Sequence, residues 1–288
     1  LFGLCRQLGM SRCGFLVVAV FAATRFAWTG KGLELNEFLG DPEVMPPLLV
    51  HMLVLLVLTA LIKERYRLAV FLTGLAILLH LQIGLTLALM TLPLYLVKLR
   101  QFEIKEVCVL ALLVIIPALP ALWHVGHMLQ RGLAKSSISS AFYIDFRHPH
   151  HFELFSAGAA VWVGVHLAVI AVAYWFFRRR ETETSQAIGK LLVCCVTLII
   201  LCLIHFTDYY LIKNDKLAQV QFLRLSPLIT ILGAICFVLI VNRWLANVRS
   251  PALANVLLAN VILIAAAIGW GWYSPRRLDV PYYFGVQR

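Results

Sequence analysis

Long runs of apolar residues recur along the chain and are separated by short polar connectors. Most runs approach the roughly 20 residues that a helix needs to cross the hydrocarbon core of a bilayer. They are continuous rather than alternating, which favours helices over the strands of a membrane barrel. The pattern predicts about nine membrane segments, at residues 13–29, 48–62, 68–97 (counted as two), 106–123, 157–177, 190–206, 225–242 and 252–271.

The apolar run from 68 to 97 needs two helices rather than one. It is too long for a single untilted span and short for two full ones. A polar break from His80 to Gly84 falls near its middle. We therefore predict two shortened helices that meet at a tight bend. At this bend His80 either faces a cavity or is buried and hydrogen-bonded, and the sequence leaves both readings open.

Composition agrees with a membrane protein. Hydrophobic residues make up 61% of the chain and charged residues 14%, against roughly 45–50% and about 25% in soluble domains. We expect an all-α, polytopic transmembrane bundle in which residues 1–288 form a single integral-membrane domain. The first residue is Leu1 rather than Met, which is compatible with a fragment that lacks upstream spans.

The net charge of +11 does not indicate nucleic-acid binding, because the basic residues are scattered through short loops beside apolar runs. Such residues set membrane orientation and meet anionic lipid headgroups. Alternate connectors carry most of them, and the positive-inside rule then predicts a cytoplasmic amino end. The acidic connector 30–46, the His80 bend and the connectors 124–156 and 207–224 would all lie on the opposite face.

The densest group of proton-active side chains lies just before the segment at 157–177. It contains Asp145, Arg147, His148, His150 and His151. Arg147 suits a bidentate contact to phosphate, with a histidine as general acid or base. The three histidines with Asp145 could instead ligate a metal. A cluster that only touches lipid headgroups is the third reading.

Two further places offer charged groups on the same predicted face. The connector 30–46 holds Glu34, Glu37, Asp41 and Glu43, which could supply a general base or bind a divalent cation; a solvated loop is the plainer reading. Arg224 opens the apolar segment at 225–242, where an arginine is costly unless it is paired. We expect it to contact an anion or to extend toward the interface.

The remaining histidines are weaker candidates. His124 and His127 would share one face if their segment is helical, and without a neighbouring carboxylate we expect a membrane-surface pair rather than a metal site. We expect His51, His166 and His205 to be packing or interfacial residues.

The paired short helices around His80-x-x-x-Gly84 and the motif Arg147-x-Pro149-His150-His151 resemble an uncharacterised family of bacterial multispan proteins. That family is in turn similar to GT-C glycosyltransferases and other polysaccharide-assembly membrane proteins. The resemblance implies a polyprenyl-phosphate-linked sugar donor and a catalytic acid in the first external loop, here Glu34, Glu37 or Asp41. Residues facing the phosphate would be Arg147, His148, His150, His151 and Arg224.

The leading hypothesis is therefore a glycosyltransferase-like protein of the bacterial inner membrane, acting at its extracytoplasmic face in envelope polysaccharide or glycolipid assembly. Under this hypothesis His150 acts as a general acid or base, and His80 lies beside the phosphate. Its partners would be membrane lipid and the lipid-linked sugar, and a divalent cation is the one cofactor considered. A transporter or channel subunit for an anion or metal, and a non-catalytic assembly component, remain as alternatives.

Overall fold

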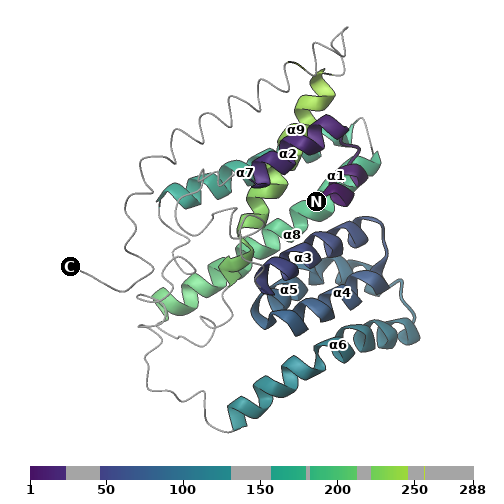
Figure 1. The fold of residues 1–288 in the computed structure, drawn as a ribbon, viewed down its shortest axis with the longest axis vertical. Coiled ribbons are helices and arrows are strands. Elements are labelled where there is room, and N and C mark those ends of the chain that lie inside the picture. Colours follow the sequence, from purple (N-terminus) through teal and green to yellow (C-terminus); the bar gives the residue numbers. More distant parts are fainter. Residues whose placement is uncertain (24–45, 131–156, 180–181, 213–221, 246–255, 257–288) are drawn as a thin grey trace, which may run out of the picture.

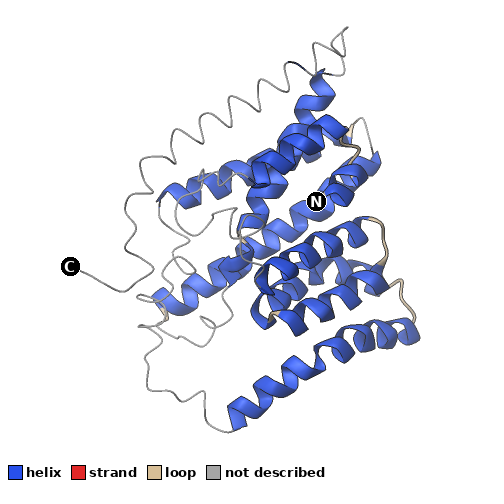
Figure 2. Ribbon diagram, in the orientation of Figure 1, coloured by secondary structure: helices blue, strands red, loops and turns tan. Residues whose placement is uncertain are grey.

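The computed structural model describes residues 1–23, 46–130, 157–179, 182–212 and 222–245, together with Val256. Every element within these ranges is a helix (Figure 2). A helix satisfies its backbone hydrogen bonds within one segment, which the interior of a bilayer requires because it holds no water. The predicted all-α fold class is confirmed for this part of the chain.

Most predicted segments coincide with one helix each. The segment 252–271 lies outside the described residues apart from Val256. In chain order the helices are α1 (Phe2–Gln7), α2 (Arg12–Ala23), α3 (Pro46–Ile62), α4 (Tyr66–Leu79), α5 (Leu81–Leu99), α6 (Ile104–Gln130), α7 (Ala157–Arg178), α8 (Thr182–Phe206), the π-helical turn η5 (Thr207–Leu211), the 3₁₀ turn η7 (Phe222–Leu225) and α9 (Pro227–Leu245).

Length and hydropathy identify this chain as a helical membrane protein. Within the described ranges, α5, α6, α8 and α9 are long and apolar enough to cross a bilayer, and stretches of α3, α4 and α7 form shorter apolar helices.

The helices form two groups joined by α8 (Figure 1). In the first group α4 packs against α3, α5 and α6, and in the second α9 packs against α7 and α2. Helix α8 contacts both α5 and α7. Its buried positions include Cys194, Cys195 and Cys202, and side chains of this size allow neighbouring helices to approach closely.

Helix α6 lies at the edge of the bundle and packs chiefly on α4. The backbones approach closely at Gly74, where a Cβ atom would lie 2.6 Å from the carbonyl oxygen of Val114. The other faces of α6 expose large apolar side chains, among them Ile116 and Trp123. Exposure of this kind fits a lipid-facing helix, since lipid chains are as apolar as these residues.

Polar groups gather at two opposite ends of the bundle. At one end, Lys190 Nζ donates to Glu64 Oε1 (3.0 Å) and to the carbonyl oxygen of Leu61 (3.3 Å). Arg67 pairs with Glu106 at the same end, with 2.9 Å between Nε and Oε1. The chain runs from this end through α4 and returns through α5, so His80 lies at the other end.

Two predicted boundaries were wrong. Helix α6 does not end near 123 but continues through Pro117 and Pro120 to Gln130, because a membrane helix tolerates proline where neighbouring groups satisfy the freed carbonyls. Helix α8 begins at Thr182 rather than near 190. Its polar first turns escaped the hydropathy pattern, although an acidic residue such as Glu183 favours a helix start.

The bend between α4 and α5 is a single residue, which confirms the prediction of two helices meeting near His80. His80 has an extended backbone (φ −154°, ψ 98°), and its N–H donates to the carbonyl oxygen of Ala76 at 2.9 Å. So short a reversal brings the first turn of α5 onto α4. At Gly84 a Cβ atom would lie 2.3 Å from the backbone nitrogen of Ile77, so only glycine fits there.

We predict that Gly84→Ala destabilises the protein by about 1–3 kcal/mol, because the methyl group meets backbone rather than a flexible side chain. Thermal unfolding of purified protein in mild detergent measures the effect. Gly164→Ala is the matched control, since no atom lies within 4 Å of a Cβ atom there and alanine favours a helix. Equal melting temperatures for the two variants would contradict the proposed packing of the bend.

Candidate functional site

The structure brings together two of the residues singled out in the sequence. Arg224 Nη1 lies 2.9 Å from Nε2 of His80, although 144 positions separate them in the chain. Both side chains are half-buried. This contact joins the α4–α5 bend to the segment that precedes α9, and it forms the centre of the candidate site.

The segment before α9 holds Arg224 in place through its apolar neighbours. Phe222 and Leu225 of η7 are buried, and so is Ser226. Pro227 then begins α9, a position that suits proline because the first helical N–H needs no partner within the helix. Arg224 is thus carried on a turn that buries Phe222 and Leu225 and packs against α5 and α8.

The contact with Arg224 determines the protonation of His80. A guanidinium can only donate, so Nε2 must offer a lone pair and the ring must be neutral with its proton on Nδ1. The backbone N–H of Ile83 also points at Nδ1, at 3.4 Å, but both contacts cannot be satisfied by one neutral tautomer. The shorter contact to the charged donor is the stronger one. Burial, and secondly the charge of Arg224, lower the pKa of His80 to about 4.

A buried carboxylate lies at the same end of the bundle. Asp208, in the π-helical turn η5 that continues α8, is 8% exposed. In the part of the chain that the structure describes, it is the only acidic residue that is buried. One turn earlier, His205 is buried and its ring meets that of Phe222 edge-on, with 6.3 Å between centroids. Asp208 therefore follows a residue in contact with the turn that carries Arg224.

Asp208 was not among the site residues predicted from the sequence. His205 was predicted to be a packing or interfacial residue, and its burial fits a packing residue. The spacing His205-x-x-Asp208 at the end of an apolar run was the available signal, because both residues share a face if the helix continues past the run. π-Helical turns of this kind often occur at functional sites.

The candidate acids of connector 30–46 and the cluster around 145–151 lie outside the described residues. These residues are Glu34, Glu37, Asp41, Arg147, His148, His150 and His151.

No group of three or more potential metal ligands occurs within the described ranges. His124 and His127 do lie in a helix, α6, and His124 is exposed. The groups that this site offers are a cation, a neutral imidazole and a buried carboxylate, which together suit an anionic ligand with a hydroxyl group beside it.

We predict that lowering the pH destabilises the protein through His80. Its pKa is about 4 in the folded chain and near 6.5 when unfolded, so the unfolded state binds the extra proton. Its contribution to stability is complete above about pH 6.5 and is lost as the pH falls toward 4. The melting temperature of the parent should fall more steeply over this interval than that of His80→Gln. Parallel curves for the two proteins would contradict this assignment.

Comparisons with known proteins give no relative: no family model matches the chain, and neither the curated proteins nor the solved structures contain a match.

Proposed function

We propose that this protein is a membrane glycosyltransferase-like protein that holds a polyprenyl-phosphate-linked sugar at the end of the bundle where His80 and Arg224 meet. The contact between these two residues carries the proposal. It places a guanidinium and a neutral imidazole side by side at one end of the bundle, with Arg224 Nη1 and His80 Nε2 2.9 Å apart. Both side chains are only half-buried, so both keep some exposed surface.

A phosphate group fits this pair well. The planar guanidinium of Arg224 can donate two parallel hydrogen bonds to phosphate oxygens. When it does so, Nε2 of His80 is released from its present contact and can take up a proton, which adds a second positive donor. The lipid tail would then lie along apolar helix faces such as those exposed on α5 and α6.

The transfer step needs a base for the acceptor. An acceptor hydroxyl oxygen attacks the anomeric carbon of the sugar, the bond from that carbon to the phosphate oxygen breaks, and polyprenyl phosphate leaves with the bonding electron pair. The hydroxyl proton passes to a carboxylate. Asp208 is the candidate within the described residues, and Glu34, Glu37 and Asp41 of connector 30–46 remain the candidates from the sequence.

The proposal also covers the number of membrane segments, their arrangement and the orientation of the chain in the membrane. Nine membrane segments in a GT-C-like arrangement would place Arg147, His148, His150 and His151 on the connector that leads into α7, at the same end as Arg224. The end that carries Lys190 and Arg67 would be cytoplasmic under the positive-inside rule. The proposed location is the bacterial inner membrane.

We predict that Arg224→Ala lowers sugar transfer about 100-fold, in line with the loss of one key donor to a developing negative charge. The transfer rate of Arg224→Lys should lie between those of the parent and Arg224→Ala, because lysine keeps the charge but loses the bidentate geometry. Asp208→Asn should also lower turnover, through the chemical step rather than through donor binding. Release of polyprenyl phosphate from a panel of polyprenyl-phosphate hexoses provides the measurement.

Arg178→Ala is the matched control, since Arg178 is an exposed cation at the other end of the bundle. It should keep the parent rate. Parent-like turnover in Arg224→Ala and Asp208→Asn would remove both proposed roles. Donor binding without any transfer in the parent would favour the transporter or assembly alternatives instead.

We also predict that donor binding tightens as the pH falls from 8 to 5.5. A bound phosphodiester raises the pKa of His80, so the complex takes up a proton that the free protein does not hold. A farnesyl phosphate glucoside is a suitable probe, because a phosphodiester keeps one negative charge throughout this range. His80→Gln should bind with an affinity that hardly changes with pH, and an equally pH-dependent affinity in this variant would contradict the role of His80.

A further inference from the structure

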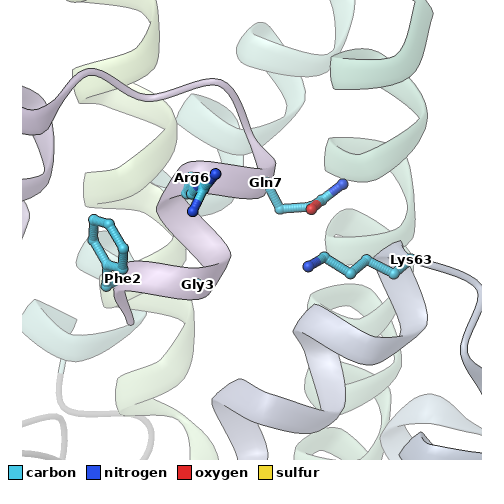
Figure 3. Close-up of a pocket in the computed structure, with 5 residues that line it drawn as sticks. All are labelled: Phe2, Gly3, Arg6, Gln7 and Lys63. Atoms are coloured by element: carbon cyan, nitrogen blue, oxygen red, sulfur yellow. The ribbon is translucent and has the colours of Figure 1, made fainter.

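A second site candidate lies at the opposite, basic end of the bundle. Between the short helix α1 and the end of α3 the surface forms an open hollow of about 460 Å³ (Figure 3). Lys63 reaches from the end of α3 toward α1, and the Gln7 side chain extends over the same opening (Figure 3). The hollow is lined by Phe2, Gly3, Arg6, Gln7 and Lys63.

The lining is positively charged and contains no carboxylate. Among the described residues, the nearby acid Glu64 is engaged elsewhere, because it pairs with Lys190 at 3.0 Å. That pairing holds the pKa of Glu64 below its ordinary value through the hydrogen bond from Lys190. Neither Arg6 nor Lys63 forms an ion pair with a carboxylate within the described part of the chain.

The hollow continues toward α2. A neighbouring depression of about 270 Å³ shares Phe2 and Arg6 with it and adds Arg12 and Phe15. The rings of Phe2 and Phe15 meet edge-on with 5.1 Å between their centroids. We call the two adjoining depressions the trough; its lining includes the cations Arg6, Arg12 and Lys63 and the ring of Phe2, which both depressions share.

The trough lies at the end of the apolar helix α3, next to exposed apolar side chains. Helix α1 buries Leu4 and Cys5 against the protein, while Phe2 is 50% exposed and Leu16 of α2 is 59% exposed. Charged and apolar surface thus adjoin each other at the end of the membrane helices. A ligand that matches both has an anionic head and long apolar chains.

We propose that this trough binds the headgroup phosphate of an anionic phospholipid. Arg6 and Lys63 contact the phosphate oxygens, with Arg6 suited to a two-pronged contact and Lys63 acting as a point charge. The Gln7 amide contacts a headgroup hydroxyl, and the acyl chains lie against the exposed apolar surface beside Phe2 and Leu16. This site is independent of sugar transfer at the other end.

Native mass spectrometry of the purified protein in nanodiscs tests the proposal. The discs contain phosphatidylglycerol and phosphatidylcholine in equal amounts, and the lipids that remain bound after release are counted. The parent should retain phosphatidylglycerol preferentially, and Arg6→Ala/Lys63→Ala should retain about tenfold less of it. Lys98→Ala/Arg100→Ala removes two cations from the same end without touching the trough and should behave as the parent does.

A charge-preserving variant distinguishes loss of the binding charges from a folding defect. Arg6→Lys/Lys63→Arg should keep most of the bound phosphatidylglycerol, and all variants should melt within a few degrees of the parent in phosphatidylcholine alone. Equal retention by the parent and Arg6→Ala/Lys63→Ala would overturn the proposal. So would complete displacement of phosphatidylglycerol by inorganic phosphate or glycerol phosphate, because the trough would then recognise free phosphate rather than a lipid.

Discussion

The one-residue reversal between α4 and α5 is the constraint on which the site depends. It requires two helix backbones to touch immediately after the turn, which Gly84 alone permits at its position. The same turn fixes the side chain of His80 at the end of the bundle, with one nitrogen facing the start of α5 and the other facing Arg224. A longer connection would have moved the imidazole away from the helix ends. The same one-residue turn therefore sets both the close helix packing at Gly84 and the position of the His80 imidazole.

The bundle separates its polar chemistry into two ends with apolar surface between them. At one end, ion pairs such as Glu64–Lys190 and Arg67–Glu106 tie helices together through exposed or partly exposed groups. Each such pair contributes little to stability, because water screens it. At the other end the polar groups are more enclosed, and their interactions are stronger for that reason. This difference in enclosure is the reason for proposing sugar transfer at the second end and lipid headgroup binding at the first.

Burial also distinguishes the candidate groups within the site. His205 and Asp208 are buried, whereas His80 and Arg224 are half-buried and therefore partly exposed. A buried carboxylate can support a proton transfer that an exposed loop acid would perform less efficiently, since an enclosed site excludes competing water. Its burial at the end of α8 is therefore the observation that makes Asp208 the candidate base of the proposed mechanism among the described residues.

The sequence by itself determined the fold class, the approximate helices and the division of the run 68–97 at His80, because these follow from hydropathy and from the thickness of a bilayer. It also marked His80 and Arg224 as unusual, since a charged or proton-active side chain beside an apolar helix needs a reason. Only the tertiary structure decided that the two touch, that Asp208 is buried at the end of α8, and that Lys190 bonds to Glu64. These facts depend on how helices distant in the chain pack together, and no periodicity within one segment encodes that packing.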